Sequence, residues 1–234
     1  MNVPFSSGSA ARPGEGGAAP IIVRAARREE DRLLAPLLAR AFQRDPQLSW
    51  LLGSSEASRR PLERFFEIHL NDAARYGAVD VADDDGSGQV IGAALWMPPG
   101  RRYPTALRQL ATIPTYVRIF GSRLTAAQRV LAATAKVHPT EPHWYLTVLG
   151  VEPREQGRGA GAALVRAGLA RAGAAGVPAY LETNSEKNVA IYQHLGFEVR
   201  DHVEIPGGCP PSTTMWHPAP TGAAAPEAEG RADQ

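Results

Sequence analysis

The chain has 234 residues, 44% of them hydrophobic and 21% charged, which suits one globular domain with a sizeable buried core. Its 25 basic and 24 acidic residues give a formal net charge of +1, so no general electrostatic attraction to nucleic acid or to an anionic membrane is expected. The single cysteine, Cys209, excludes an internal disulfide and a multi-cysteine metal site, and a reducing compartment fits this usage best.

Neither a secretion signal nor a membrane span is expected. Residues 1–19 are mostly Gly, Ala, Ser and Pro rather than a charged start followed by an apolar run. No stretch approaches the roughly 20 apolar residues that a span needs. We therefore expect a soluble cytoplasmic protein, with a domain over residues 20–218 between flexible tails at 1–19 and 219–234.

The first part of the domain begins with a strand pattern at 21–25 and a helical pattern at 29–42, although Pro36 is unfavourable inside such a helix. Residues 45–60 carry turn residues around a short apolar cluster, and apolar spacing around 62–70 predicts a second helix.

A hairpin and a long insertion follow. Strands at 78–82 and 90–97 are joined through Asp-Asp-Asp-Gly-Ser-Gly, a strong turn signal. From 98 to 142 the pattern predicts broken helical pieces, interrupted by Pro99, Pro104 and Pro114. An insertion of this length usually carries function.

The last part has the clearest pattern of alternating strands and helices. The expected elements are strand 143–151, a glycine turn, helix 161–175, strand 178–184, helix 188–195, and strands near 197–203 and 213–217. This order predicts a mixed α/β sheet with helices packed on it.

The glycine turn runs Gln156-Gly157-Arg158-Gly159-Ala160-Gly161 and opens a helix. Glycines let the backbone approach a ligand closely, and the helix N-terminus adds its dipole, so the segment suits an anion such as a pyrophosphate. A merely tight strand-to-helix turn would have the same composition.

Two other phosphate-binding classes fit this turn poorly. A nucleotide-hydrolysing loop requires Lys followed by Ser or Thr after its glycines, and here Ala162 and Ala163 follow. A dinucleotide fingerprint needs its first glycine directly after the strand. Glu182 could imitate the acidic residue of that fingerprint, but the lead-in Val-Glu-Pro-Arg-Glu-Gln does not match it.

Gln156, Gly159 and Gly161, preceded by a strand that ends Val-Glu-Pro, resemble motif A of the Gcn5-related N-acetyltransferases, the GNAT family. Residues 179–184 and 188–197 resemble motif B at the proper distance, and the likeness covers most of 21–216. Within the family, residues 141–144, 176–183 and 192–197 are most similar to puromycin N-acetyltransferase-type resistance enzymes. The likeness fades in the stretches that would bind the acceptor.

The resemblance implies an α/β GNAT fold, with a mixed central sheet splayed between its fourth and fifth strands and helices on both faces. It also implies acetyl-CoA as co-substrate, its pantetheine arm lying along strand 143–151, where a backbone N–H near Leu149 would hold the thioester carbonyl. Gly150 would permit a local bulge there; an ordinary buried core strand remains the alternative. The coenzyme-binding residues implied in this way are Leu149, Gly150, Val151, Gln156, Gly157, Arg158, Gly159, Ala160, Gly161 and Asn188.

Tyr192 is the first candidate catalytic residue. It follows Asn188 by four residues, which places both on one helix face. In the family such a tyrosine protonates the departing coenzyme A thiolate, although it could only orient the sulfur or simply pack. Asn188 would contact the phosphopantetheine; as a helix N-cap alone it would look the same.

The acceptor amine must lose a proton before its nitrogen can attack, so a base or a water chain is needed. Glu141 ranks first because it precedes the expected catalytic strand and recurs in the puromycin-type likeness. Glu182 and His143 are alternatives with possible structural roles, and His138 is expected to lie further away.

The acceptor pocket is expected to have aromatic walls, with Asp45 attracting a cation. Core packing explains each tryptophan nearly as well. The candidate wall residues are Trp50, Trp96, Trp144 and Tyr145.

No spacing of histidines and carboxylates suggests a metal, and no Ser or Cys nucleophile has recognisable partners. Cys209 lies outside both motifs. We therefore expect direct transfer in a ternary complex.

The sequence thus predicts a monomeric or homodimeric N-acetyltransferase that acts on a small-molecule amine, in antibiotic resistance or in a tailoring step. Two alternatives stay open: a non-catalytic acyl-CoA-binding module and a protein N-terminal acetyltransferase.

Overall fold

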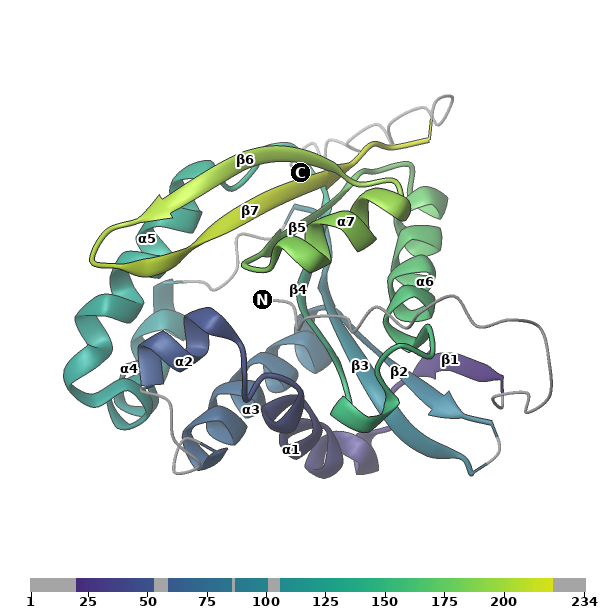
Figure 1. The fold of residues 1–234 in the computed structure, drawn as a ribbon, viewed down its shortest axis with the longest axis horizontal. Coiled ribbons are helices and arrows are strands. Elements are labelled where there is room, and N and C mark those ends of the chain that lie inside the picture. The colour runs from purple at the N-terminus through teal and green to yellow at the C-terminus, as the bar shows by residue number, and fades with distance from the viewer. Residues whose placement is uncertain (1–19, 53–58, 86, 101–105, 221–234) are drawn as a thin grey trace, which may run out of the picture.

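The computed structural model describes residues 20–52, 59–85, 87–100 and 106–220, so the tail expected at 1–19 and all but the first two residues of the tail expected at 219–234 lie outside the described residues. Seven strands form one sheet in the order β1-β2-β3-β4-β5-β7-β6 (Figure 1). Among the strands of the described ranges only the β4–β5 pair is parallel, which confirms the mixed sheet. The strands are β1 (Ile21–Ala25), β2 (Ala78–Asp84), β3 (Gln89–Met97), β4 (Trp144–Val151), β5 (Ala179–Thr183), β6 (Glu198–Ile205) and β7 (Cys209–His217).

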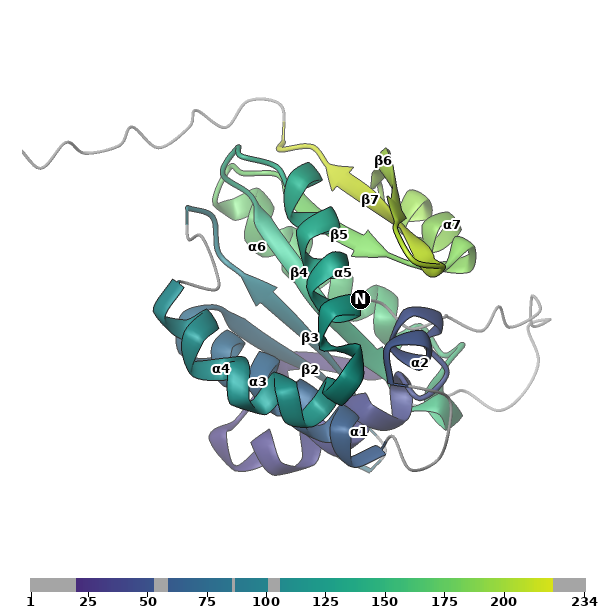
Figure 2. The ribbon, with the colours of Figure 1, turned by 90° about the vertical axis from the view of Figure 1, so that its left-hand side faces the viewer.

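Helices cover both faces of the sheet, with α1 and α3 on one side and α6 on the other (Figures 1 and 2). In the part of the chain that the structure describes, the short 3-10 turns η1 (Arg28–Glu30), η3 (Gly121–Arg123) and η4 (Pro153–Glu155) connect longer elements. The α-helices are α1 (Asp31–Ala41), α2 (Pro46–Leu52), α3 (Arg59–Tyr76), α4 (Ala106–Phe120), α5 (Leu124–Val137), α6 (Ala160–Ala174) and α7 (Glu186–His194).

One helical segment confirms the sequence-based expectation and another corrects it. The helix expected over 29–42 forms as α1, which continues through Pro36. The turn expected after Asp45 is a helix: Pro46 occupies the first position of α2, and the Asp45 carboxylate accepts a 2.7 Å hydrogen bond from the Leu48 N–H. Proline at the first position and aspartate just before it both favour a helix start.

The insertion is more regular than its prolines suggest. Helix α4 runs through Pro114, and one 3-10 turn joins it to α5. Pro104 lies outside the described residues.

Each face of the sheet carries its own apolar cluster. The side chain of Val148 packs with α1 and α3, whereas Leu149 and Leu146 pack with α6 and α7 on the other face. Trp96 is fully buried against α6, where a Cβ on Gly168 would stand 2.1 Å from its indole ring. Gly168 therefore allows α6 to lie close to the sheet.

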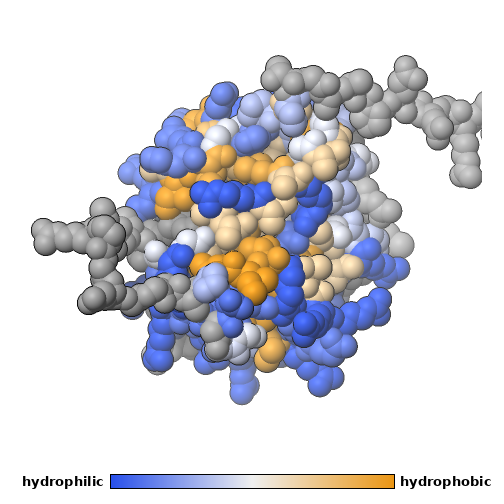
Figure 3. Space-filling model, turned by 90° about the vertical axis from the view of Figure 1, so that its right-hand side faces the viewer, coloured by the Kyte–Doolittle hydropathy of each residue, from blue (hydrophilic) through white to orange (hydrophobic). Residues whose placement is uncertain are grey.

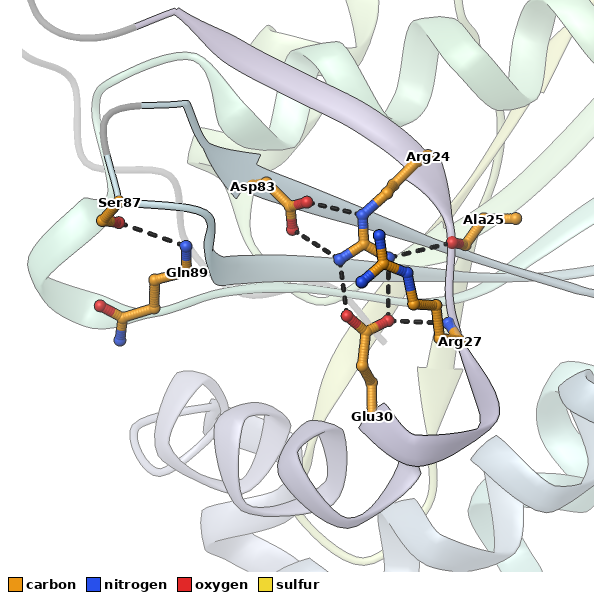
Figure 4. Close-up of polar contacts among 7 residues, drawn as sticks. All are labelled: Arg24, Ala25, Arg27, Glu30, Asp83, Ser87 and Gln89. Carbon is orange, nitrogen blue, oxygen red and sulfur yellow. Dashed lines mark hydrogen bonds and ion pairs between the residues drawn. The ribbon is translucent and has the colours of Figure 1, made fainter.

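A charged cluster fastens β1 to the rest of the sheet (Figure 4). The Arg24 guanidinium donates hydrogen bonds to Glu30 at 2.5 Å and to Asp83 at 2.6 Å. The hydrogen bond from Arg24 is the main reason why the pKa of Glu30 falls from 4.5 to about 2. The cluster ties β1 to β2 and to the start of the helical layer.

Figure 3 shows the side of the molecule on which α6 and β1 lie in Figure 1, with apolar residues gathered near its middle and hydrophilic residues around them. Ile22 of β1 is 46% exposed. Across the described ranges, no helix combines the length and the apolar character that crossing a membrane requires.

Candidate active site

The two central strands separate part of the way along their length. Parallel pairing between β4 and β5 ends with Leu146 opposite Leu181, whereas β4 continues to Val151. The side of β4 that faces β5 is therefore not paired by β5 over its last residues, as the resemblance implied. Such an unpaired strand edge can accept another extended chain.

A β-bulge decides which amides face this opening. Leu146 pairs with Trp96 and Val148 with Leu95, so Thr147 is the extra residue in β4. Before the bulge, the Trp144 N–H donates towards β5, to the Pro178 carbonyl at 2.9 Å. After it, the Glu152 N–H donates towards β3, to the Ile91 carbonyl at 2.8 Å.

Backbone amides alternate in direction along a strand. Counting back from Glu152, the N–H groups of Leu149 and Val151 therefore face the opening rather than β3. These donors are suitably placed to stabilise negative charge on a carbonyl oxygen in the opening.

The bulge does not lie at Gly150, contrary to the expectation. Gly150 pairs regularly with Ala93. A Cβ at this position would stand 2.6 Å from Leu38 and 3.3 Å from Phe42. Gly150 is thus required for the close packing of α1 on β4.

The glycine turn presents backbone amides at the end of the same strand. Gly157 and Gly159 have positive φ angles of 86° and 92°, which favour glycine. Helix α6 begins at Ala160, one residue before the expected start, and Ala163 donates to the Gly159 carbonyl. The amides that precede Ala163 point out of the helix end and can bind an anion.

Two side chains hold the turn in shape. Gln156 Nε2 donates to the Val151 carbonyl at 3.1 Å, which fastens the turn to the end of β4. Arg158 forms ion pairs with Glu155 and with Asp84, the latter at 3.1 Å. The charge of Arg158 is shared with these two carboxylates, so the turn's anion-binding capacity comes from its amides.

A pocket of about 500 Å³ adjoins the turn on the side of α1. The Arg40–Glu152 ion pair, at 2.8 Å, forms part of its wall. The pocket is separate from the opening, since neither Leu149 nor Tyr192 lines it.

Helix α7 places Asn188 and Tyr192 on its buried face, and both are fully buried. Asn188 Nδ2 donates to Thr183 Oγ1 at 3.3 Å, which ties α7 to the end of β5. The N-cap of α7 is Ser185, so the alternative that Asn188 serves as an N-cap is wrong. Burial raises the pKa of the Tyr192 phenol, so this group stays protonated at neutral pH and keeps a proton to donate.

The opposite face of β5 carries a polar row at alternate positions, Tyr180, Glu182 and Asn184. The Tyr180 hydroxyl donates to Glu182 at 3.0 Å. His138 Nδ1 lies 3.8 Å from the same carboxylate oxygen, and its ring packs edge-on against Tyr180. Burial, followed by the charge of Glu182, raises the pKa of Tyr180.

Two candidate bases lie in different surroundings from those expected. His138, expected to be remote, contacts Glu182 because the end of α5 packs beside β5. Glu141 is exposed over 56% of its side chain and forms a 3.2 Å ion pair with Arg200. A backbone N–H of its own residue and Arg200 lower the pKa of Glu141, which weakens it as a base.

His143 is buried near this cluster. Its Nδ1 lies 2.6 Å from the Glu141 carbonyl, so this nitrogen carries the proton. Burial lowers the pKa of His143, which keeps it neutral at pH 7.

The expected aromatic walls do not come together. Trp96 and Trp144 lie on the face covered by α6, where Arg171 packs 5.3 Å from the Trp144 ring. Trp50 and Tyr145 lie on the other face, and Trp50 packs against Arg123. Only that second pair shares a face with Asp45.

Asp45 is fully buried rather than open to a ligand. Asn184 Nδ2 donates to its two carboxylate oxygens at 2.9 and 3.1 Å. Burial raises the pKa of Asp45, and the hydrogen bonds from Leu48 and Asn184 oppose that rise.

Cys209 begins β7 and is buried, and burial raises the pKa of its thiol to about 11. Such a thiol is a poor nucleophile at neutral pH. Among the described residues, no three or more His, Cys, Asp or Glu side chains are grouped as metal ligands would be.

Comparison with known proteins gives one family and a consistent fold. The sequence model of the acetyltransferase (GNAT) family matches residues 39–197. The chain is 28% identical to a Corynebacterium glutamicum structure described as histone acetyltransferase HPA2 and related acetyltransferase, with a TM-score of 0.69. This match covers 87% of the chain and 99% of the other protein.

More distant solved structures have the same fold. Mosquito arylalkylamine N-acetyltransferase like 5b and the Drosophila melanogaster polyamine N-acetyltransferase that forms N-acetylagmatine are each 16% identical, with TM-scores of 0.58. Both matches cover 85% of this chain and 100% of the other.

Proposed function

The chain belongs to the acetyltransferase (GNAT) family, and from this premise we propose that it transfers the acetyl group of acetyl-CoA to the amine of a small molecule. The observation that carries the proposal is the unpaired edge of β4, where the Leu149 and Val151 amides face the opening beside β5. The glycine turn, whose amides are free to hold an anion in this proposal, lies at the end of that same edge.

The residues present fit acetyl-CoA. Gly157 to Gly161 would hold the pyrophosphate through backbone amides, and Gln156 would keep their geometry. Leu149 and Val151 would pair with the pantetheine arm, and Asn188 would fix the neighbouring end of α7. Bound there, acetyl-CoA supplies the acetyl group as a thioester.

The two faces of β5 supply the proton chemistry. We assign acceptance of the ammonium proton to Glu182 rather than Glu141, because Glu182 lies in the row beside the opening and contacts Tyr180 and His138. The freed amine forms its N–C bond as the C–S bond breaks. Tyr192, on the other face, donates a hydrogen bond or its proton to the sulfur; its raised pKa favours the hydrogen bond.

The acceptor class is a small amine, in keeping with what the arylalkylamine and polyamine enzymes of the same fold are named for. The likeness of residues 192–197 to puromycin-type enzymes adds resistance to an amine antibiotic as a biological role, with a tailoring step as its competitor.

Release of free thiol from acetyl-CoA tests the proposal. The panel comprises agmatine, 2-phenylethylamine, puromycin and a short peptide with a free N-terminus. We expect thiol release with at least one of the three small amines. Activity with the peptide alone would favour an N-terminal acetyltransferase, and coenzyme binding without any release would favour a non-catalytic module.

A further inference from the structure

The contact between Asp45 and Asn184 joins two segments far apart in the sequence. Asp45 precedes α2, and Asn184 directly follows β5. Both oxygens of the buried carboxylate accept from the same amide nitrogen, at 2.9 and 3.1 Å. The carboxylate also accepts from the Leu48 N–H, so Asp45 itself is held in place.

This contact fixes the direction of the Asn184 amide. A side-chain amide carries its donor and its acceptor on opposite sides. If the amide were rotated by 180°, its oxygen would lie about 3 Å from two carboxylate oxygens and would repel them. With Nδ2 on Asp45, Oδ1 must face away from the carboxylate.

Asn184 Oδ1 is buried and meets no hydrogen-bond donor in the described part of the chain. A buried carbonyl oxygen without a donor is costly, so it marks a place where a ligand donor would bind. The negative charge of Asp45 behind the amide also polarises Oδ1 and strengthens it as an acceptor.

The position of Asn184 indicates which ligand group would donate a hydrogen bond to its Oδ1. It continues the row of Tyr180 and Glu182, on the face of β5 opposite the Thr183–Asn188 contact and α7. The proposed proton acceptor and Asn184 therefore lie two residues apart, about 7 Å, beside the opening.

We propose that Asn184 Oδ1 accepts a hydrogen bond from the protonated primary amine of the acceptor, and that Asp45 is a positioning residue that sets this orientation. The inference rests on the proposed function. In this proposal Asp45 acts through Asn184, instead of making the direct contact with a cation that the sequence predicted.

Three variants separate positioning from general damage. Asp45→Ser keeps a good N-cap for α2 but is too short to hold Asn184. Asn184→Ala removes the acceptor oxygen itself. Gln47→Ala is the matched control, because Gln47 fastens α2 to Ser212 and Pro210 and makes no contact with Asn184 among the described residues.

The measurements are KM for the best amine among agmatine, 2-phenylethylamine and puromycin, kcat, and calorimetric affinity for acetyl-CoA. We expect KM to rise roughly tenfold or more in Asp45→Ser and in Asn184→Ala, as for loss of a hydrogen bond to a charged group. The double variant should be no worse than Asn184→Ala alone, because both changes remove one interaction. The affinity for acetyl-CoA should be unchanged in all variants. Gln47→Ala should also keep the wild-type KM and kcat.

The outcomes separate this inference from the proposed function. Wild-type turnover with unchanged KM in Asn184→Ala would overturn the inference alone. Additive losses in the double variant would also overturn it, since Asp45 would then act independently. If Asp45→Ser fails to fold, Asn184→Ala still decides. A wild-type chain that acetylates none of the amines overturns the function and the inference together.

Discussion

The hydroxyl of Tyr180 donates a 3.0 Å hydrogen bond to Glu182, two residues further along β5. Both side chains lie on the face opposite Tyr192, so β5 separates the proposed proton acceptor from the proposed donor to sulfur. Variants on the two faces therefore test two separate steps, the removal of the ammonium proton and the departure of the sulfur.

Replacing Glu182 with Gln should lower kcat at neutral pH by roughly 10²-fold or more, the usual effect of losing a general base. The loss should shrink towards pH 10, because the amine then deprotonates without help. Glu141→Gln is the control and should stay near wild type. A pH profile of kcat/KM measures both; a larger loss in the Glu141 variant would restore Glu141 as the base.

Replacing Tyr192 with Phe removes only the hydroxyl and keeps the ring in place against Phe197. Turnover should fall by roughly 10²-fold while acetyl-CoA affinity changes little. Single-turnover rates are the decisive measurement, because slow product release would mask a defect in steady-state kcat. A wild-type single-turnover rate would rule out this role for Tyr192.

Replacing Gly159 with Leu should abolish acetyl-CoA binding while the fold persists. A Cβ at Gly159 meets nothing within 4 Å, so the cost to folding is limited to its positive φ of 92°. The added side chain would occupy the space in front of the amides. Gly208→Leu is the matched control, because Gly208 is equally open with φ of 78°. Equal coenzyme affinity in both variants would remove the turn from the site.

The strand and helix order, the splay and the glycine turn could be predicted because local patterns and two spaced motifs encode them. The bulge could not: only the pairing of Trp96 with Leu146 and Leu95 with Val148 reveals that Thr147 is extra. The sequence singled out Gly150 as the site of a bulge. The structure shows that a glycine is needed there because Leu38, far away in the sequence, packs against it.

The acceptor side was harder to predict for the same reason. His138 reaches Glu182, and Asp45 reaches Asn184, only after α5 packs on β6 and α2 packs on β7. The prediction that the tryptophans share one pocket wall failed because the sequence does not reveal which face of the sheet each of them occupies. The alternation of Tyr180, Glu182 and Asn184 along the strand is the one local pattern that places these three residues on one face.

The Arg24–Glu30 contact gives a prediction for stability rather than activity. The pKa of Glu30 is lowered from 4.5 to about 2, so its contribution is present above pH 4.5 and is lost as pH falls towards 2. Glu30→Gln should therefore lower the melting temperature at pH 7 by roughly 2–4 °C, as a loss of about 1 kcal/mol would in a domain of this size. Exposed Glu29 provides the control, because Glu29→Gln leaves the Arg24 contacts intact. Thermal unfolding at several pH values should show the Glu30 difference shrinking between pH 4.5 and 2; a difference that stays constant with pH would mean that packing, and not the ionised carboxylate, stabilises this corner.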